Sequence, residues 1–71
     1  MKETALITGA AGFIGFHLSK KLLKNNFKVI GLDNLNSYYD RTLKEKRLEI
    51  IAEDYPDEKN NWKFIETDLI N

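Results

Sequence analysis

Three glycines at intervals of three residues, within the string TGAAGFIG, constrain the fold of this chain more than any other feature. They come directly after the short apolar run Ala5-Leu6-Ile7, and helix-forming sequence follows them. A glycine string between an apolar strand and a helix lets the backbone turn sharply and brings main-chain N–H groups close to a ligand. The chain is therefore predicted to begin with a strand, a tight glycine turn and a helix in immediate succession.

Hydrophobic periodicity extends this order to strand, helix, strand, helix, strand. Two successive crossover units imply parallel strands with right-handed connections. The predicted fold class is α/β, as the N-terminal βαβαβ part of a doubly wound Rossmann fold, with three parallel strands. Residues 1–71 would form the N-terminal part of one dinucleotide-binding domain. The expected strands cover residues 3–8, 27–32 and 62–67, and the expected helices cover about 13–24 and 40–54.

The same periodicity predicts which sides of these elements pack. The run Ala5-Leu6-Ile7 is typical of a strand that is buried on both faces. In the first helix the expected apolar face comprises Ile14, Leu18 and Leu22, which are spaced by four. In the second helix the expected packed side comprises Leu43, Leu48, Ile50 and Ile51.

Composition argues against several classes of function. Charged residues make up 31% of the chain and the formal net charge is zero, so there is no electrostatic reason to expect nucleic acid or an anionic membrane as a partner. The chain has no cysteine and a single histidine, His17, so no metal site is expected. The N-terminal apolar run is too short for a signal peptide or a membrane span. We interpret the protein as cytoplasmic.

Each glycine of the string has its own expected role in binding a diphosphate. Gly9 would make the turn, Gly12 would leave room for a pyrophosphate, and Gly15 would allow close contact between helix and strand. The first turn of a helix carries unpaired N–H groups and about half a positive charge, which suit a diphosphate. The alternative interpretation is that the glycines serve only to form a tight turn and bind no ligand.

An acidic residue at the end of the second strand supports the nucleotide interpretation. Asp33 lies 18 residues after Gly15, where a carboxylate can accept hydrogen bonds from both ribose hydroxyls of an adenosine. A 2′-phosphate would be repelled there, so NAD is favoured over NADP, although the nearby Arg41 could offset the repulsion. An aspartate that merely ends a strand would explain the residue type but not its position.

The strings TGAAGFIGFHL and GLDNLNSYYD together resemble the extended short-chain dehydrogenase/reductase family, in particular its NAD-dependent nucleotide-sugar epimerases and dehydratases. The spacing TGxxGxxG is typical of that group, and NLNSYYD followed by LKEKRLE is most similar to the UDP-glucuronate 4-epimerases. This resemblance covers nearly the whole chain. It implies an enzyme that uses NAD to interconvert UDP-glucuronate and UDP-galacturonate by oxidation and re-reduction at C4.

The resemblance also implies a set of cofactor-binding residues, which it divides among three parts of the dinucleotide. The pyrophosphate positions are matched by Gly9, Gly12, Phe13 and Ile14, with Gly15 completing the glycine motif. The adenosine ribose is matched by Asp33 and Asn34, with Asn36 and Ser37 at the same edge. The adenine is matched by Asp68 and Leu69, although Asp68 would also serve as the N-cap of a following helix.

The catalytic residues are expected outside this chain. By resemblance, the base is the tyrosine of a Tyr-x-x-x-Lys pair on a later helix. Tyr55 and Lys59 have that spacing, but Pro56 keeps Tyr55 out of helical geometry. We therefore expect these 71 residues to be an inactive N-terminal fragment that holds only the adenosine and pyrophosphate contacts.

Partners follow from the same interpretation. The parent enzyme is expected to be a homodimer that acts on a UDP-sugar. The fragment is expected to self-associate through its first strand, whose edge would be unpaired. The alternatives are a sugar dehydratase or an NADP-linked reductase of the same family, and a nucleotide-sensing module without catalytic activity.

Overall fold

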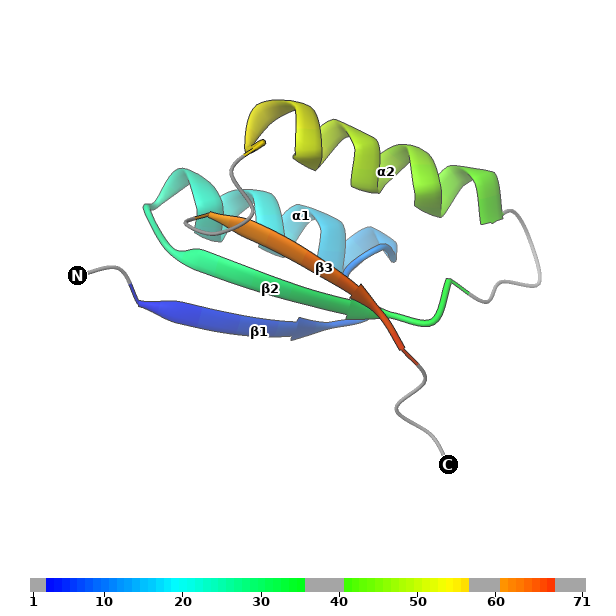
Figure 1. Cartoon of the computed structure of the whole chain (residues 1–71), viewed down its shortest axis with the longest axis horizontal. Coiled ribbons are helices and arrows are strands. Elements are labelled where there is room, and N and C mark those ends of the chain that lie inside the picture. Colours follow the sequence, from blue (N-terminus) through cyan, green and yellow to red (C-terminus); the bar gives the residue numbers. More distant parts are fainter. Residues whose placement is uncertain (1–2, 36–40, 57–60, 68–71) are drawn as a thin grey trace.

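The fold alternates strands and helices in the predicted order. A computed structural model describes residues 3–35, 41–56 and 61–67. Its elements are β1 (Thr4–Thr8), α1 (Phe13–Lys24), β2 (Lys28–Asp33), α2 (Arg41–Asp54) and β3 (Trp62–Glu66) (Figure 1). The strands form one parallel sheet in the order β1-β2-β3. The predicted α/β class with three parallel strands is confirmed.

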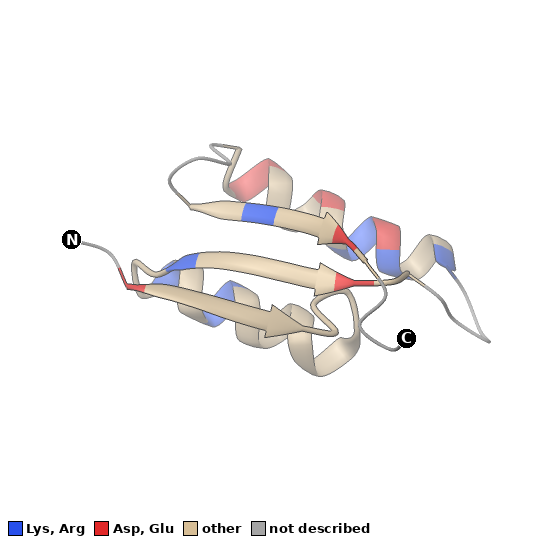
Figure 2. Cartoon of the chain, turned by 60° about the horizontal axis from the view of Figure 1, so that its bottom comes forward, with Lys and Arg blue, Asp and Glu red and all other residues tan. Residues whose placement is uncertain are grey.

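Both helices cover the same face of the sheet, as right-handed crossovers require for strands added in one direction (Figure 1). The opposite face of the sheet carries no helix among the residues described, and it is the nearer one in Figure 2. Along β1 the side chains of Ala5 and Ile7 are half-buried, whereas Leu6 between them is 62% exposed. The prediction that this strand is buried on both faces is therefore wrong for the chain as described, because only one face is covered.

The core lies between the sheet and the helices and is centred on Val29, Ile51 and Trp62. Val29 of β2 is the register partner of Trp62 at the start of β3. A Cβ atom at Gly31 would lie 2.5 Å from Cη2 of Trp62 and 2.8 Å from Cβ of Ala10. Because Gly31 has no side chain, both the indole ring and the loop after β1 can approach the middle of the sheet.

The buried face of α1 was only partly predicted. Leu22 is partly buried against the core as expected, but Ile14 is 79% exposed and Leu18 is 43% exposed. The buried residues of the helix are Phe16, Ser19 and Leu23. The apolar side chains of this helix occupy more than one side, so their spacing alone does not fix its rotation. The rotation is instead determined by Gly15, which lies four positions before Ser19. Gly15 faces the loop at the start of the helix, where a Cβ atom would meet backbone atoms of Gly9 and Ala10.

The packed side of α2 was only partly predicted. Ile51 is fully buried and Leu48 packs against the core, but Leu43 is 48% exposed and Ile50 is 40% exposed. The first turns of α2 are held by polar contacts from Lys44 and Arg47, rather than by apolar packing. Among the described residues, neither helix is long and apolar enough to cross a membrane.

Candidate functional site

The turn between β1 and α1, which we call the glycine bend (residues 9–12), folds back over the end of β2. Gly9 has a φ of 66°, a left-handed conformation that glycine adopts without steric cost. The N–H of Gly12 donates to the carbonyl oxygen of Gly9 at 3.0 Å, and the N–H of Ala10 donates to that of Leu32 at 3.0 Å. Ala10 and Ala11 are fully buried. The bend is thus fixed to the carboxyl edge of the sheet.

The first turn of α1 lies directly against the glycine bend. A Cβ atom at Gly15 would overlap the carbonyl oxygen of Gly9, and it would lie 2.8 Å from the carbonyl carbon of Gly9 and 2.9 Å from Cα of Ala10. These neighbours are backbone atoms, which cannot move aside as the end of a side chain can. The close approach expected of Gly15 is therefore present, and its partner is the bend itself.

The N-terminus of α1 has the features of an anion-binding helix end. Gly12 is the N-cap, it supplies no side-chain hydrogen bond, and no acidic residue lies in the first turn. The N–H groups of the first turn have no carbonyl partner within the helix. Phe13 and Ile14, the first two residues of α1, are 67% and 79% exposed. This end therefore combines backbone donors and a positive dipole with a first turn that contains no acidic residue.

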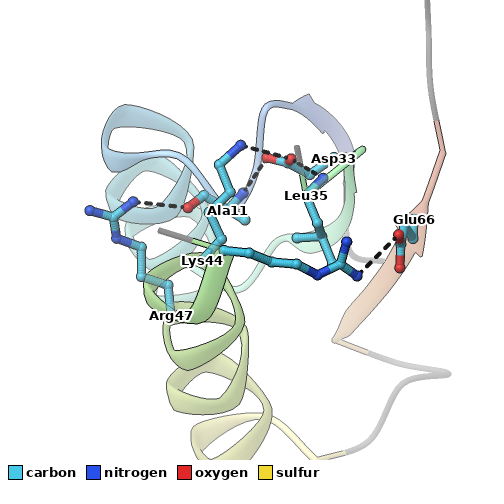
Figure 3. Close-up of polar contacts among 7 residues, drawn as sticks. Ala11, Asp33, Leu35, Lys44, Arg47 and Glu66 are labelled. Atoms are coloured by element: carbon cyan, nitrogen blue, oxygen red, sulfur yellow. Dashed lines mark hydrogen bonds and ion pairs between the residues drawn. The ribbon is translucent and has the colours of Figure 1, made fainter. Parts of the chain in front are cut away.

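The carboxylate of Asp33 connects the glycine bend to the tip of β2. The Asp33 side chain is only 3% exposed. Its Oδ2 accepts the N–H of Ala11 at 3.0 Å, and its Oδ1 accepts the N–H of Leu35 at 2.7 Å. The ammonium of Lys44 lies 3.2 Å from the same Oδ1 (Figure 3). A buried charge requires such partners to offset the loss of hydration. The structure thus brings together Asp33 and the glycine bend.

Three cations of α2 reach the carboxyl edge of the sheet, and this was not predicted from the sequence. Arg47 Nη1 donates to the carbonyl oxygen of Ala11 at 3.0 Å, and Lys44 contacts Asp33. Arg41, the cation that could offset the repulsion of a 2′-phosphate, lies 3.4 Å from Glu66 at the end of β3. The sequence feature that could have predicted these contacts is the recurrence of a cation every third residue, at Arg41, Lys44 and Arg47, in the helix after Asp33. Acidic residues end both β2 and β3 (Figure 2).

The remaining predicted residues divide into described and undescribed positions. Asn34 follows Asp33 directly and is exposed. Tyr55 comes after the end of α2 and packs against the core, in keeping with a structural role. Outside the described residues lie Asn36, Ser37, Lys59, Asp68 and Leu69.

A concavity of about 500 Å³ lies between α2 and β3. No residue of the glycine bend and no part of Asp33 lines it, so it is separate from the site described above. Its lining is mainly apolar and consists of Leu35, Glu45, Leu48, Glu49, Ala52, Tyr55, Pro56, Trp62 and Phe64.

The arrangement at the glycine bend suits a dinucleotide. A diphosphate needs a close backbone approach and converging N–H donors, which Gly12 and the first turn of α1 provide. An adenosine ribose needs a hydrogen-bond acceptor at the tip of the next strand, where Asp33 lies. The fold defines the chain as a βαβαβ unit with a three-stranded parallel sheet, consistent with the N-terminal part of a Rossmann fold.

Comparison with known proteins narrows this class. Residues 6–71 match the sequence model of a family described as GDP-mannose 4,6 dehydratase. The chain therefore belongs to the NAD-dependent epimerase/dehydratase family, as its glycine motif predicted.

Individual relatives align with most of the chain. An uncharacterized protein of Methanocaldococcus jannaschii is 57% identical over 69 residues, or 94% of this chain and 20% of that protein. Protein CapI of Staphylococcus aureus is 50% identical over 66 residues, or 93% of this chain and 18% of that protein. A UDP-glucuronate 4-epimerase of Thermodesulfobacterium geofontis is 44% identical over 66 residues, or 93% of this chain and 19% of that protein. The chain spans about a fifth of the length of these relatives.

Proposed function

We propose that this chain is the NAD-binding segment of a nucleotide-sugar epimerase that interconverts UDP-glucuronate and UDP-galacturonate. The family supports the general class, since its members are NAD-dependent epimerases and dehydratases. The particular reaction is supported by the relative from Thermodesulfobacterium geofontis, a UDP-glucuronate 4-epimerase that aligns with 93% of the chain.

The observation that carries the cofactor assignment is the position of the buried Asp33 carboxylate against the glycine bend. In the proposed complex the diphosphate lies over Gly12 and receives N–H groups from the first turn of α1, which includes Phe13 and Ile14. The ribose hydroxyls donate to Asp33. Asn34 belongs to the same ribose edge. The proposed set is completed by Asn36 and Ser37 at that edge, and by Asp68 and Leu69 at the adenine.

The bound cofactor would supply a hydride acceptor that removes hydrogen from C4 of the sugar and returns it to the other face. This chain contributes binding rather than proton transfer. The uncapped start of α1 holds the diphosphate, and Asp33 fixes the adenosine end at a set distance from it. Together these two contacts would hold the dinucleotide at its diphosphate and at its adenosine end.

The charge of Asp33 favours NAD over NADP. A carboxylate accepts hydrogen bonds from a 2′-hydroxyl, whereas a 2′-phosphate has no proton to donate at neutral pH and is repelled. The Asp33 side chain is 3% exposed, so solvent screens this repulsion only weakly. We therefore assign NAD as the principal cofactor.

Activity of the full-length protein tests the proposal. Incubation with UDP-glucuronate in D₂O should give UDP-galacturonate, resolved by ion-exchange chromatography, without deuterium at C4, because the hydride leaves and returns within the active site. Asp33→Asn should weaken NAD binding by about 10- to 100-fold, since hydrogen bonds to a charged group contribute about 1.5–3 kcal/mol each. Glu66→Gln, which removes an exposed carboxylate at the tip of the next strand, is the matched control and should bind NAD normally. Recovery of unchanged UDP-glucuronate would refute the epimerase assignment.

A dehydratase is the second candidate, and the description of the matching family, GDP-mannose 4,6 dehydratase, favours it. It would release a keto sugar that is lighter by one water, which mass spectrometry separates from an isomer of the substrate. A nucleotide-sensing module would bind NAD but turn over no sugar.

A further inference from the structure

β3 is an outer strand of the sheet, and one side of its backbone faces away from β2 (Figure 2). The carbonyl oxygen of Asn61 accepts the N–H of Val29 at 2.7 Å, and the N–H of Thr67 donates to the carbonyl oxygen of Asp33 at 3.0 Å. Every second residue of a parallel strand bonds to the same neighbour, so the backbone groups of residues 62, 64 and 66 point away from β2. Among the residues described, no strand lies beyond β3. These backbone groups therefore form an open edge.

The concavity between α2 and β3 adjoins this open edge. Its β3 side is formed by Trp62 and Phe64, whose rings are stacked with centroids 6.4 Å apart, and its α2 side includes Leu48 and Ala52. The volume of about 500 Å³ is large enough to hold ligand groups. Side chains that lie opposite each other on paired strands share a face of the sheet. Alternate side chains of a strand added at the open edge would thus point toward the concavity.

The lining of the concavity is acidic near the carboxyl end of β3. Glu45 and Glu49 are exposed, lie one helical turn apart on α2 and belong to the lining. Arg41, at the start of α2, lies 3.4 Å from Glu66 at the end of β3, so Glu45 borders the same end of the strand. Arg41 also lies 3.6 Å from Glu45, whereas Glu49 has no ion pair with any described residue. Carboxylates at this spacing repel each other, and a cation from a partner would relieve the repulsion.

The charges favour a basic segment over a second copy of this chain as the occupant. Pairing of two β3 strands about a twofold axis would bring the two α2 helices side by side, so Glu45 and Glu49 would face their own copies. On the uncovered face of the sheet, Lys63 of β3 is exposed. An acidic residue directly opposite Lys63 would be attracted, and a basic one would be repelled.

We propose that the open edge of β3 and the concavity beside it form a docking site for an extended segment of a partner protein. The segment adds to the sheet as an antiparallel strand, and its backbone bonds to the free groups of the edge. Two apolar side chains enter the concavity opposite Trp62 and Phe64. A basic side chain, two residues further toward the carboxyl end of β3, lies near Glu45 and Glu49. This assignment does not depend on the proposed cofactor-binding function.

Binding of a short peptide to the full-length protein tests the assignment. The probe is acetyl-Lys-Thr-Leu-Glu-Leu joined at its C-terminus to fluorescein, and fluorescence anisotropy measures its dissociation constant. A second peptide, in which the lysine and the glutamate are exchanged, has the same composition. It should bind roughly fivefold or more weakly, because it loses two exposed ion pairs and gains like-charge contacts. N-methylation of the central leucine removes one backbone donor and should weaken binding by about two- to tenfold.

Three variants locate the site on the protein. Ala52→Trp fills the concavity and should abolish binding. Glu49→Lys should weaken binding of the probe and strengthen that of the exchanged peptide, a reversal that serves even if Ala52→Trp folds poorly. Glu53→Lys makes the same charge change on α2 outside the lining, and should alter neither affinity by more than about twofold.

Several results would overturn the assignment. They are no binding of the probe by the wild-type protein, equal binding of the two peptides, and unchanged binding after N-methylation, which would exclude strand addition. A dimer of the full-length protein that Ala52→Trp dissociates, measured by light scattering, would give the site to a second copy instead. NAD binding by the three variants should match the wild type, because the concavity is separate from the glycine bend.

Discussion

Replacement of Gly15 by alanine should destabilise the fold, although the same change usually stabilises a helix. Alanine is favoured over glycine by about 1 kcal/mol within a helix. Here the added Cβ would overlap the carbonyl oxygen of Gly9 and would lie 2.8 Å and 2.9 Å from two further backbone atoms. Overpacking of this kind costs about 1–3 kcal/mol, and rigid backbone neighbours favour the upper part of that range. We expect a net loss of about 1–2 kcal/mol in the free energy of unfolding.

Thermal and urea unfolding, followed by far-ultraviolet circular dichroism, measure this loss. For a domain of this size, 1–2 kcal/mol corresponds to a fall in Tm of roughly 4–16 °C. Gly12→Ala is the matched control, because its Cβ would approach Gly9 oxygen only to 3.3 Å, so that its main cost is the less favourable N-cap, about 0.5–1 kcal/mol relative to glycine. A Gly15→Ala protein as stable as the wild type would refute the contact between α1 and the glycine bend.

Three further predictions concern other parts of the chain. Asp33→Asn should lower the free energy of unfolding, measured by urea titration, by about 1–3 kcal/mol, because the amide NH₂ would face a backbone N–H donor. The control Glu66→Gln affects only an exposed ion pair and should change this free energy by less than about 1 kcal/mol. Ser19→Ala should raise the melting temperature, since the buried Ser19 hydroxyl has no hydrogen-bond partner among the described residues and alanine is the better helix former. Leu6→Lys should reduce self-association of the isolated chain, measured by size-exclusion chromatography with light scattering, because charge on an exposed edge strand opposes pairing; a monomeric wild type would contradict this.

The order of elements and the proximity of Asp33 to the glycine bend were predictable from the sequence. Both depend on local signals, namely hydrophobic period, glycine spacing and the rule that parallel strands end at one edge of a sheet. The rotation of α1 was not predictable, because Ile14 and Leu18 form an apolar stripe as convincing as the buried one. A close contact between Gly15 and the bend decided it, and that contact joins two backbones rather than two apolar side chains.

The role of α2 in the site depends on tertiary structure. Sequence proximity drew attention to Arg41, as a nearby cation that could offset the repulsion of a 2′-phosphate by Asp33. The path of α2 across the tip of β2 instead places Lys44 beside Asp33, and gives Arg41 the carboxylate at the end of β3. Helical spacing identifies which cations share a side, but only the crossing of the helix over the sheet determines which acid each one meets.

The two backbone hydrogen bonds to Asp33 have a consequence for the energetics of ligand binding. The N–H groups of Ala11 and Leu35 hold opposite oxygens of the carboxylate, so its rotamer is selected when the chain folds. The associated loss of side-chain entropy is therefore part of folding, and in the proposed complex a ribose would meet an acceptor whose direction is already set. Preorganisation of this kind converts more of each hydrogen bond into affinity than a mobile surface carboxylate would.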